Sequence, residues 1–249
     1  KRFFDGPFNR FFLKPYDGFI VLSEAVKQDV LMFCPDARVT VLPHPSYQQY
    51  GKRVPKAEAR QKLGLDPTKK TLLFFGLIRP YKGLSLLLEA FSSLDDSYQI
   101  IIAGEVYGDR SNYDALMGKS RNTNIHFHDQ FIPNERVQDY FSCADLCVLP
   151  YLSATQSGIK AMCDAFSLPT LVSKAGGLSE EIQEGVNGFI LEGLNPEGLT
   201  KKIQEVCTES ALYPVVQCLE ENLKSKENEW GDFAEAVLKF SSEIEQSKN

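Results

Sequence analysis

Short apolar runs alternate with segments of helical spacing along most of the chain, and this alternation constrains the fold more than any other feature. After a polar stretch at residues 46–56, six such runs follow one another, each with a helical segment behind it. Strands and helices in regular alternation form a parallel sheet that carries helices on both faces. Six strands are too few for the eight-stranded barrel built from the same units. The sequence therefore predicts an α/β fold with a doubly wound parallel sheet.

The boundaries of these elements follow from the apolar pattern. Short continuous apolar runs indicate strands buried on both faces, and apolar residues three and four positions apart indicate helices with one buried face. Before the polar stretch, Ser23 is the expected N-cap of a helix at 24–33, which lies between strands at 17–22 and 38–42. After it we expect strands at 71–76, 98–103, 124–128, 145–149, 169–173 and 188–191, and helices at 58–63, 83–94, 111–119, 134–142, 157–167, 178–184 and 196–208.

The composition argues against several classes of function. The chain has 249 residues, a net charge of −6 and an isoelectric point of about 5.2, so it lacks the basic balance on which nucleic-acid binding relies. No apolar run approaches the roughly 18 residues that a membrane-spanning helix needs. The six cysteines are scattered and form no C-x-x-C pair, which is typical of free thiols in a reducing cytosol. His126 and His128 alternate within a predicted strand without further ligands nearby, so we expect no metal site.

One candidate ligand site lies in LLFFGLIRPYKGLSLLLEAF, residues 72–91. Gly76 ends a buried strand, and Arg79 and Lys82 lie in the loop before the next helix. Open α/β sheets bind ligands at the carboxyl ends of their strands, and both the Arg fork and the Lys ammonium suit phosphate oxygens. The residues alone leave open the alternative that both cations are ordinary solvated surface charges.

A second candidate lies in LPYLSATQSGIKAMCDAFSLPTLVSKAGGLSEE, residues 149–181. Thr155, Gln156, Ser157 and Gly158 stand where a loop becomes a helix, so free N–H groups and the positive end of the helix dipole point outward there. An ordinary strand-to-helix connection also carries Gly and Ser for turn reasons alone. The phosphate interpretation gains weight because two candidate loops occur in one chain.

The first residues are unusually aromatic. Phe3, Phe4, Phe8, Phe11 and Phe12 lie in an apolar segment of helical spacing, and residue 1 is a lysine. A free domain rarely exposes such a face. We therefore expect a fragment whose preceding part is missing, or a processed product. In this chain alone we expect the aromatic face to be covered by self-association through residues 3–13, or to be disordered.

Four motifs in this order, GLIRPYKG, LPYLSATQSGIKAM, SKAGGLSEEI and EGVNGFILEG, resemble the carboxyl-terminal half of retaining nucleotide-sugar glycosyltransferases of GT-B architecture. More narrowly, the chain is similar to the bacterial glycosyl transferases group 1 that build surface polysaccharides. The resemblance covers nearly the whole chain. It implies the end of an amino-terminal acceptor domain and a hinge over residues 1–45. It further implies a Rossmann-like donor-binding domain over 46–214 and crossover helices over 215–249. Trp230 is the single tryptophan of this charged, helical tail, and we expect it to be a packing anchor.

The resemblance also implies a role for each candidate residue. Arg79 and Lys82 would be the catalytic pair that neutralises the donor diphosphate and the leaving nucleotide, so that neither a metal nor a cofactor is needed. The other donor contacts would come from Phe131 and Ile132 at the base, Glu105 and Tyr107 near the ribose or phosphates, and Gly76, Thr155, Gln156, Ser157, Gly158, Gly176 and Gly177 around the sugar and phosphates.

Three positions depart from the family pattern. Many relatives carry a Glu, seven residues and a second Glu, and these positions fall on Ala154 and Met162 here. Asp164 lies two positions further, about 200° round a helix, and does not replace the second carboxylate. Many relatives also carry the first cation where this chain has Leu77. We expect a variant site with Met162 packed in the core, and the alternative is a degenerate, non-catalytic member.

These features predict a transferase in the cytoplasm, or peripheral at the inner membrane face. It would move a sugar, with retention, from a nucleotide-diphosphate sugar to the hydroxyl of a lipid-linked or saccharide acceptor. A missing amino-terminal domain would bind the acceptor, so this chain alone would bind nucleotide and transfer no sugar. A catalytically silent nucleotide-sugar binding module is the second hypothesis. A dinucleotide-dependent oxidoreductase is the third, and the first strand–helix loop lacks the G-x-G-x-x-G that it requires.

Overall fold

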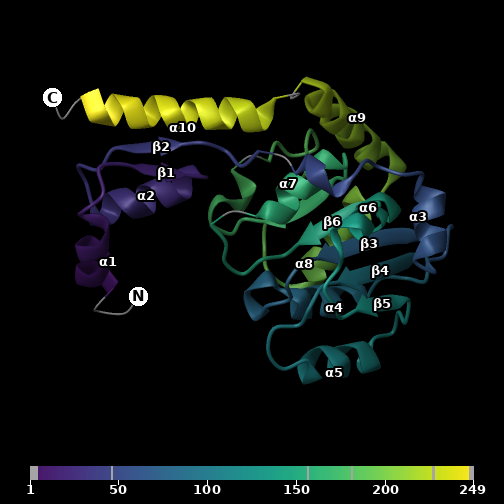
Figure 1. Ribbon diagram of the computed structural model, residues 1–249. Helices are drawn as coiled ribbons and strands as arrows, with labels where there is room; N and C mark the ends of the chain where they lie inside the picture. Colours follow the sequence, from purple (N-terminus) through teal and green to yellow (C-terminus); the bar gives the residue numbers. More distant parts are fainter. Residues whose placement is uncertain (1–4, 46, 156, 181, 226–227, 247–249) are drawn as a thin grey trace. The chain divides into compact units, whose positions relative to one another are not determined.

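The computed structural model describes residues 5–45, 47–155, 157–180, 182–225 and 228–246 (Figure 1). The chain divides into a larger compact unit, residues 46–225, and a smaller one made of residues 1–45 and 226–249. The first division falls where the sequence predicts a boundary. The second falls later than the predicted residue 215, because α9 (Glu209–Ser225) runs through that position and buries Val215 and Leu219 in the core of the larger unit.

The larger unit is built on a parallel sheet, which confirms the predicted α/β fold. In the described residues its six strands are β3 (Lys70–Phe75), β4 (Tyr98–Ala103), β5 (Ile125–His128), β6 (Leu146–Leu149), β7 (Thr170–Ser173) and β8 (Phe189–Leu191). They lie in the order β5-β4-β3-β6-β7-β8, and each neighbouring pair is parallel. The chain runs outward from β3 to β5 and then returns to β6, on the other side of β3. The direction of the strand order therefore reverses between β3 and β6.

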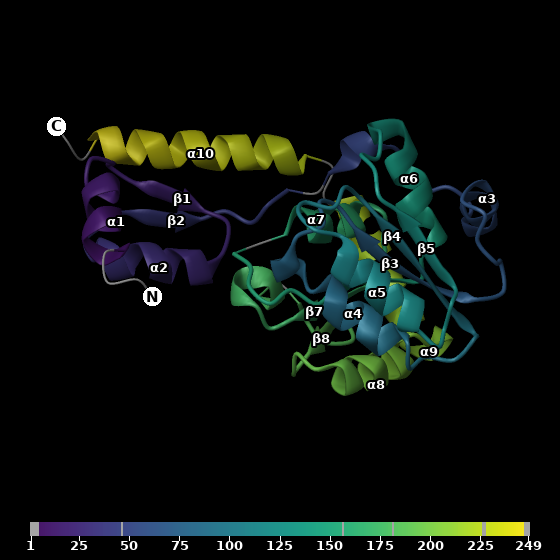
Figure 2. The same cartoon turned by 90° about the horizontal axis from the view of Figure 1, so that it is seen from below.

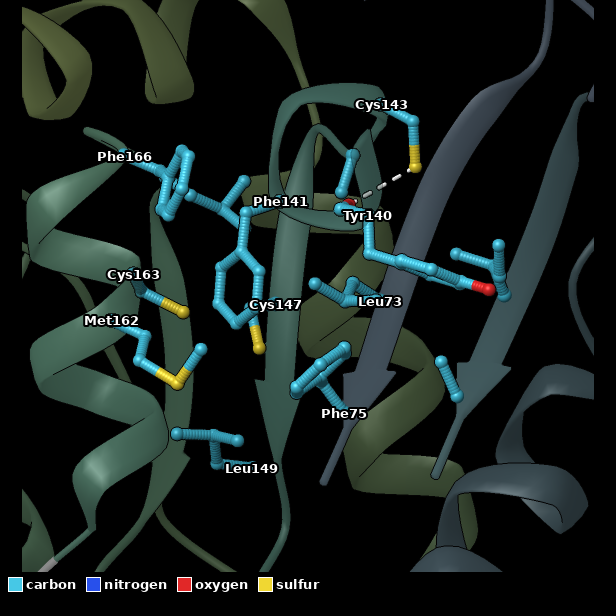
Figure 3. Close-up of a cluster of buried hydrophobic side chains, with 14 of the residues drawn as sticks. Leu73, Phe75, Tyr140, Phe141, Cys143, Cys147, Leu149, Met162, Cys163 and Phe166 are labelled. Atoms are coloured by element: carbon cyan, nitrogen blue, oxygen red, sulfur yellow. Dashed lines mark hydrogen bonds between the residues drawn. The ribbon is translucent and has the colours of Figure 1, made fainter. Parts of the chain in front are cut away.

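Helices cover both faces of this sheet. One face packs against α3 (Lys56–Lys62), α6 (Asn134–Cys143) and α7 (Gly158–Ala165), and the other against α4 (Leu84–Phe91), α5 (Ser111–Lys119), α8 (Pro196–Val206) and α9. Figure 2 shows α6 and α8 on opposite sides of the strands. Successive strand residues point to opposite faces, so Phe75 and Phe74 enter different clusters. Figure 3 shows the cluster of Phe75, in which the Phe141 ring packs between Phe75 and Phe166.

The α-helix expected at residues 178–184 is wrong. Gly176–Ser179 form a short 3-10 helix, η3, and turns follow it. The Asn187 side chain accepts a hydrogen bond from the Gln183 N–H at 2.7 Å, and the Glu184 carboxylate accepts one from the Ile190 N–H at 2.6 Å. The Asn187 side chain thus satisfies a main-chain donor, the Gln183 N–H, that a continuing helix would have bonded to one of its own carbonyls.

The smaller unit contains α1 (Asp5–Leu13), β1 (Phe19–Val21), α2 (Glu24–Phe33), β2 (Val39–Val41) and α10 (Glu229–Gln246), and β1 pairs with β2 in parallel. The Ser23 hydroxyl accepts the Val26 N–H at 3.3 Å, which confirms the predicted N-cap of α2. Phe240 and Ile244 of α10 pack against Gly18, where a Cβ would meet both side chains. Trp230, the expected packing anchor, is about half exposed and lies edge-on to the His44 ring.

The aromatic side chains of α1 lie at the surface of the smaller unit. Phe8, Phe11 and Phe12 are exposed, and Phe3 and Phe4 lie outside the described residues. No helix in the described part of the chain combines the length and the apolar character that crossing a membrane requires.

Candidate functional site

The candidate site lies at the carboxyl ends of β3 and β6, where the strand order reverses. Loops diverge on either side of such a switch point and leave a crevice above the sheet, which is where open α/β sheets bind their ligands. The loop after β3 carries Gly76, Arg79 and Lys82, and the loop after β6 carries Thr155 and Ser157. The two candidate phosphate loops of the sequence therefore follow strands that are hydrogen-bonded neighbours.

Glycines hold the loops after β3 and β4 against each other. Gly76 has a φ of 93° and donates its N–H to the Ala103 carbonyl at 2.9 Å. Gly104 has a φ of 139°, and a Cβ there would collide with the Gly76 carbonyl oxygen. Beyond these glycines, the Ile78 N–H donates to the Glu105 carbonyl at 2.8 Å. Strand-like pairing thus continues past the end of the sheet and places the two loops side by side.

A third glycine brings the loop after β3 against the loop after β6. Gly83 has a φ of 74°, and a Cβ there would collide with the Pro150 carbonyl oxygen. The Leu152 N–H donates to the Tyr81 carbonyl at 2.7 Å. Lys82 lies directly before Gly83 in the 3-10 helix η2 (Pro80–Lys82). The position of Lys82 is therefore fixed by two main-chain contacts with the neighbouring loop.

The Lys82 ammonium lies in a largely buried position at the centre of the site. The residue is 9% exposed, and Nζ lies 5.7 Å from the centre of the Tyr151 ring. In the described part of the chain, no carboxylate forms an ion pair with it. Burial lowers the Lys82 pKa, and the positive charge of Arg79 lowers it further. A cation in such surroundings favours an anionic ligand.

Arg79 stands beside Lys82 and contacts an aromatic ring. Its guanidinium carbon lies 4.1 Å from the centre of the Tyr107 ring, and Tyr107 is 63% exposed. Glu105, in the same loop as Tyr107, is exposed. Of the two residues that we predict near the ribose or phosphates, Tyr107 is thus in direct contact with Arg79.

The amino terminus of α7 supplies the second part of the site. Ser157 adopts an extended conformation at the N-cap and makes no side-chain capping bond, and α7 begins at Gly158. The first N–H groups of a helix lack partners within it and attract anions. Gly176 has a φ of 52°, and a Cβ there would collide with the Ala154 carbonyl oxygen, so Gly176 packs closely against this loop. Gly177 follows it in η3. Gln156 lies outside the described residues.

The two residues predicted for the base pocket have different surroundings. Phe131 is 66% exposed in the loop after β5, whereas Ile132 is buried in the core between the sheet, α3 and α6. Of the two, Phe131 is therefore the one whose side chain is available to a ligand.

Two residues of α7, Met162 and Asp164, lie at or near the position where many relatives of the resembled family carry the second Glu. Met162 is 6% exposed and packs in the hydrophobic cluster of Figure 3, as expected. Asp164 does not reach into the site, because the Lys160 ammonium on the same helix binds both of its carboxylate oxygens at 2.5 and 2.6 Å. Neither position 162 nor position 164 therefore supplies a carboxylate in place of the second Glu.

Sequence reasoning missed Tyr151. This buried residue lies under Lys82, its hydroxyl stands 3.5 Å from the Ser157 hydroxyl, and its carbonyl accepts the Ser173 hydroxyl at 2.6 Å. It therefore connects the cationic loop to the start of α7. The sequence feature that could have identified Tyr151 is its position just after β6, next to Pro150, at the carboxyl end of a buried strand.

Comparisons with known proteins show which proteins this chain resembles. Residues 55–230 match the family described as "Glycosyl transferases group 1". The D-inositol 3-phosphate glycosyltransferase of Rhodococcus jostii is 26% identical over 163 residues, which are 62% of this chain and 36% of that protein. The lipopolysaccharide 1,2-N-acetylglucosaminetransferase of Salmonella typhimurium is 25% identical over 212 residues, which are 80% of this chain and 55% of that protein. The chain therefore spans between about a third and just over half of these relatives.

A solved structure shares the fold. HepE of Anabaena in complex with UDP-glucose superposes with a TM-score of 0.77 and 16% sequence identity, over 91% of this chain and 64% of that one.

Proposed function

This chain belongs to the glycosyl transferases group 1 family, and we propose that its larger unit binds the nucleotide-diphosphate sugar from which the whole protein transfers a sugar. The observation that carries this proposal is the pair of Arg79 and Lys82 at the switch point of the sheet. Both cations lack a carboxylate partner in the described part of the chain, and Lys82 is largely buried. The superposed HepE structure, solved with UDP-glucose, is consistent with a ligand of this class.

The chemistry follows from the charges. When the bond between sugar and diphosphate breaks, negative charge accumulates on the leaving phosphate oxygens. Arg79 and Lys82 would stabilise that charge, and the first N–H groups of α7 would bind the distal phosphate. Because these groups supply the positive charge, the proposed reaction needs no bound metal. We further propose that Phe131 lies against the base and that Gly76, Gly176 and Gly177 allow the main chain to approach the donor closely.

Transfer of the sugar to an acceptor is a proposal about the whole protein. This chain spans 36% and 55% of the two curated relatives, so sugar transfer is proposed for the longer protein and not for the chain alone. We propose a hydroxyl on a saccharide or lipid-linked acceptor, retention at the sugar carbon, and a place in polysaccharide or glycolipid synthesis. The name of the Salmonella relative, a lipopolysaccharide sugar transferase, supports that class of acceptor.

A catalytically silent donor-binding module is the second candidate function. The observation in its favour is that Ala154 and the buried Met162 stand where many relatives have carboxylates. Binding of a nucleotide sugar by the full-length protein, without transfer to any acceptor in a broad panel, would support this second function over the first.

A panel of nucleotides tests the proposed ligand class. We expect one nucleoside diphosphate to raise the melting temperature by about 5–10 °C at a hundredfold excess over its Kd, because it binds the folded state alone. NAD and NADP serve as controls for the oxidoreductase hypothesis and should leave the melting temperature unchanged.

Two variants test the cationic pair. Arg79→Ala and Lys82→Ala should each weaken binding of that nucleotide by about 1–3 kcal/mol, the range for hydrogen bonds to charged groups. Calorimetric titration measures the loss. Unchanged affinity in both variants would contradict the assignment of the site.

A further inference from the structure

The contact between Arg79 and Tyr107 differs from those of other arginines in the larger unit. Arg60 and Arg136 bind the carboxylates of Asp145 and Asp139. Arg110 lies over the Phe127 ring but also binds two aspartates. Arg79 has the ring contact without the carboxylate, among the residues that the structure describes.

An aromatic partner leaves an arginine free to bind an anion. A carboxylate would occupy two of the guanidinium N–H donors and cancel much of its charge. A ring face attracts the cation through its π electrons, while the N–H donors at the edge of the guanidinium plane stay available. The Tyr107 ring therefore restricts where the Arg79 guanidinium lies without competing for its donors.

The backbone of Tyr107 is hydrogen-bonded to the loop that carries Arg79. The Tyr107 N–H donates to the carbonyl of Ile78, the residue directly before Arg79, at 2.9 Å. Ile78 in turn pairs with the loop after β4 through its own N–H and a β-bridge to Val106. Tyr107 is 63% exposed, so burial of an apolar side chain does not explain its position.

We propose that Tyr107 is a positioning residue, which holds the Arg79 guanidinium in place for the diphosphate of the donor and acts through Arg79. This inference rests on the proposed function for the ligand. It replaces the simpler expectation that Tyr107 itself contacts the ribose or phosphates.

A double-mutant cycle separates the two roles. Calorimetry with the nucleoside diphosphate from the thermal panel should show a loss of about 2–5-fold in affinity for Tyr107→Ala, the value of an exposed cation–π contact. Tyr107→Phe should bind like the unmodified chain, because the ring remains. In the Arg79→Ala background, Tyr107→Ala should cause no further loss. Tyr213→Ala, which removes an exposed tyrosine from α9, is the matched control and should bind normally.

A measurement without nucleotide tests the contact itself. The Arg79 Nε–Hε signal in NMR should be shifted by the ring current of Tyr107, should lose that shift in Tyr107→Ala and should keep it in Tyr107→Phe.

The inference is overturned if the Arg79 signal carries no ring-current shift, or if Tyr107→Ala costs as much affinity in the Arg79→Ala background as in the unmodified chain. Failure of the unmodified chain to bind any nucleoside diphosphate is a different result. It would overturn the proposed function, and the positioning role with it, even where NMR shows the contact.

Discussion

Lys82 carries its charge where water has little access and no carboxylate of the described residues pairs with it. Burial and the charge of Arg79 both lower its pKa. A partly desolvated cation is unfavourable until a counter-ion arrives. A bound diphosphate would be that counter-ion, and its negative charge would raise the pKa of Lys82 again. Binding of the ligand and protonation of this side chain should therefore be linked.

Nucleotide affinity should fall as the pH rises through the lowered pKa of Lys82. Below that pKa the lysine is charged before the nucleotide arrives, whereas above it binding has to take up a proton. Titrations from about pH 7 to about pH 10, in two buffers of different ionisation enthalpy, measure both the affinity and the proton uptake. Lys82→Arg is the matched control, because the guanidinium stays charged over this range. Proton uptake that persists in Lys82→Arg would assign the linkage to another group.

Met162 should contribute to packing and not to nucleotide binding. Met162→Leu keeps the side-chain volume and should cost less than about 1.5 kcal/mol of stability. Met162→Ala leaves a cavity and should cost about 2–5 kcal/mol. Nucleotide affinity should stay the same in both variants wherever they are folded. Denaturant unfolding and calorimetry measure the two quantities. A tenfold loss of affinity in a stable Met162→Leu protein would place Met162 in the ligand site.

At the scale of elements, the strands and most helices of the larger unit were predictable because their apolar pattern is local. β3 and β4 end in continuous apolar runs, residues 72–75 and 100–103, and both strands are buried almost throughout. The segment after η3 was not predictable, because the side chain of Asn187 accepts the Gln183 N–H that a helix would have bonded internally. The two candidate phosphate loops lie side by side because β3 is next to β6, which is a property of the topology and not of either segment.

The site residues, too, were predictable only where their position follows from the local sequence. Arg79, Lys82 and the start of α7 follow from the rule that ligands bind at the carboxyl ends of parallel strands. The roles of Tyr107 and Tyr151 require contacts between loops that are distant in sequence. Ile132 was predicted in the base pocket together with Phe131, but its side chain is buried while that of Phe131 is exposed.

Gly83 joins two of these loops, and its substitution should disturb both. Gly83→Ala introduces a Cβ into the Pro150 carbonyl as well as an unfavourable positive φ. Gly64 has a similar φ of 67° with open space around it, so Gly64→Ala isolates the cost of the conformation, about 1–2 kcal/mol. We expect Gly83→Ala to lose about 1–3 kcal/mol more stability than Gly64→Ala and to weaken nucleotide binding. Equal stability of the two variants would show that the loops separate easily.

At the scale of the whole molecule, two histidines of the larger unit should make its stability depend on pH. Burial lowers the pKa of His126 and of His128, and the neighbouring His128 and Arg136, respectively, lower them further. The unfolded chain therefore binds more protons than the folded one in mildly acidic solution. Stability should be fully present above the ordinary histidine pKa of about 6.5 and should fall as the pH drops below it.

Melting temperatures between about pH 7.5 and about pH 5.5 test this dependence. His128→Gln should reduce it, since the amide does not titrate and still offers a hydrogen bond to the Tyr140 hydroxyl, which His128 contacts at 2.8 Å. His44→Gln, in the smaller unit, is the control for losing a histidine elsewhere. An unchanged pH profile in His128→Gln would contradict the assignment.

The smaller unit is made from both ends of the chain, with the whole larger unit between them. During synthesis, β1 and β2 leave the ribosome before the larger unit, and Phe240 and Ile244 of α10, which pack against Gly18, leave it after the larger unit. Since domains generally fold as units while the chain is being made, the larger unit has all of its residues before the smaller one does. The smaller unit therefore reaches its final form only after α10 has been made, and its early strands have to remain soluble until then.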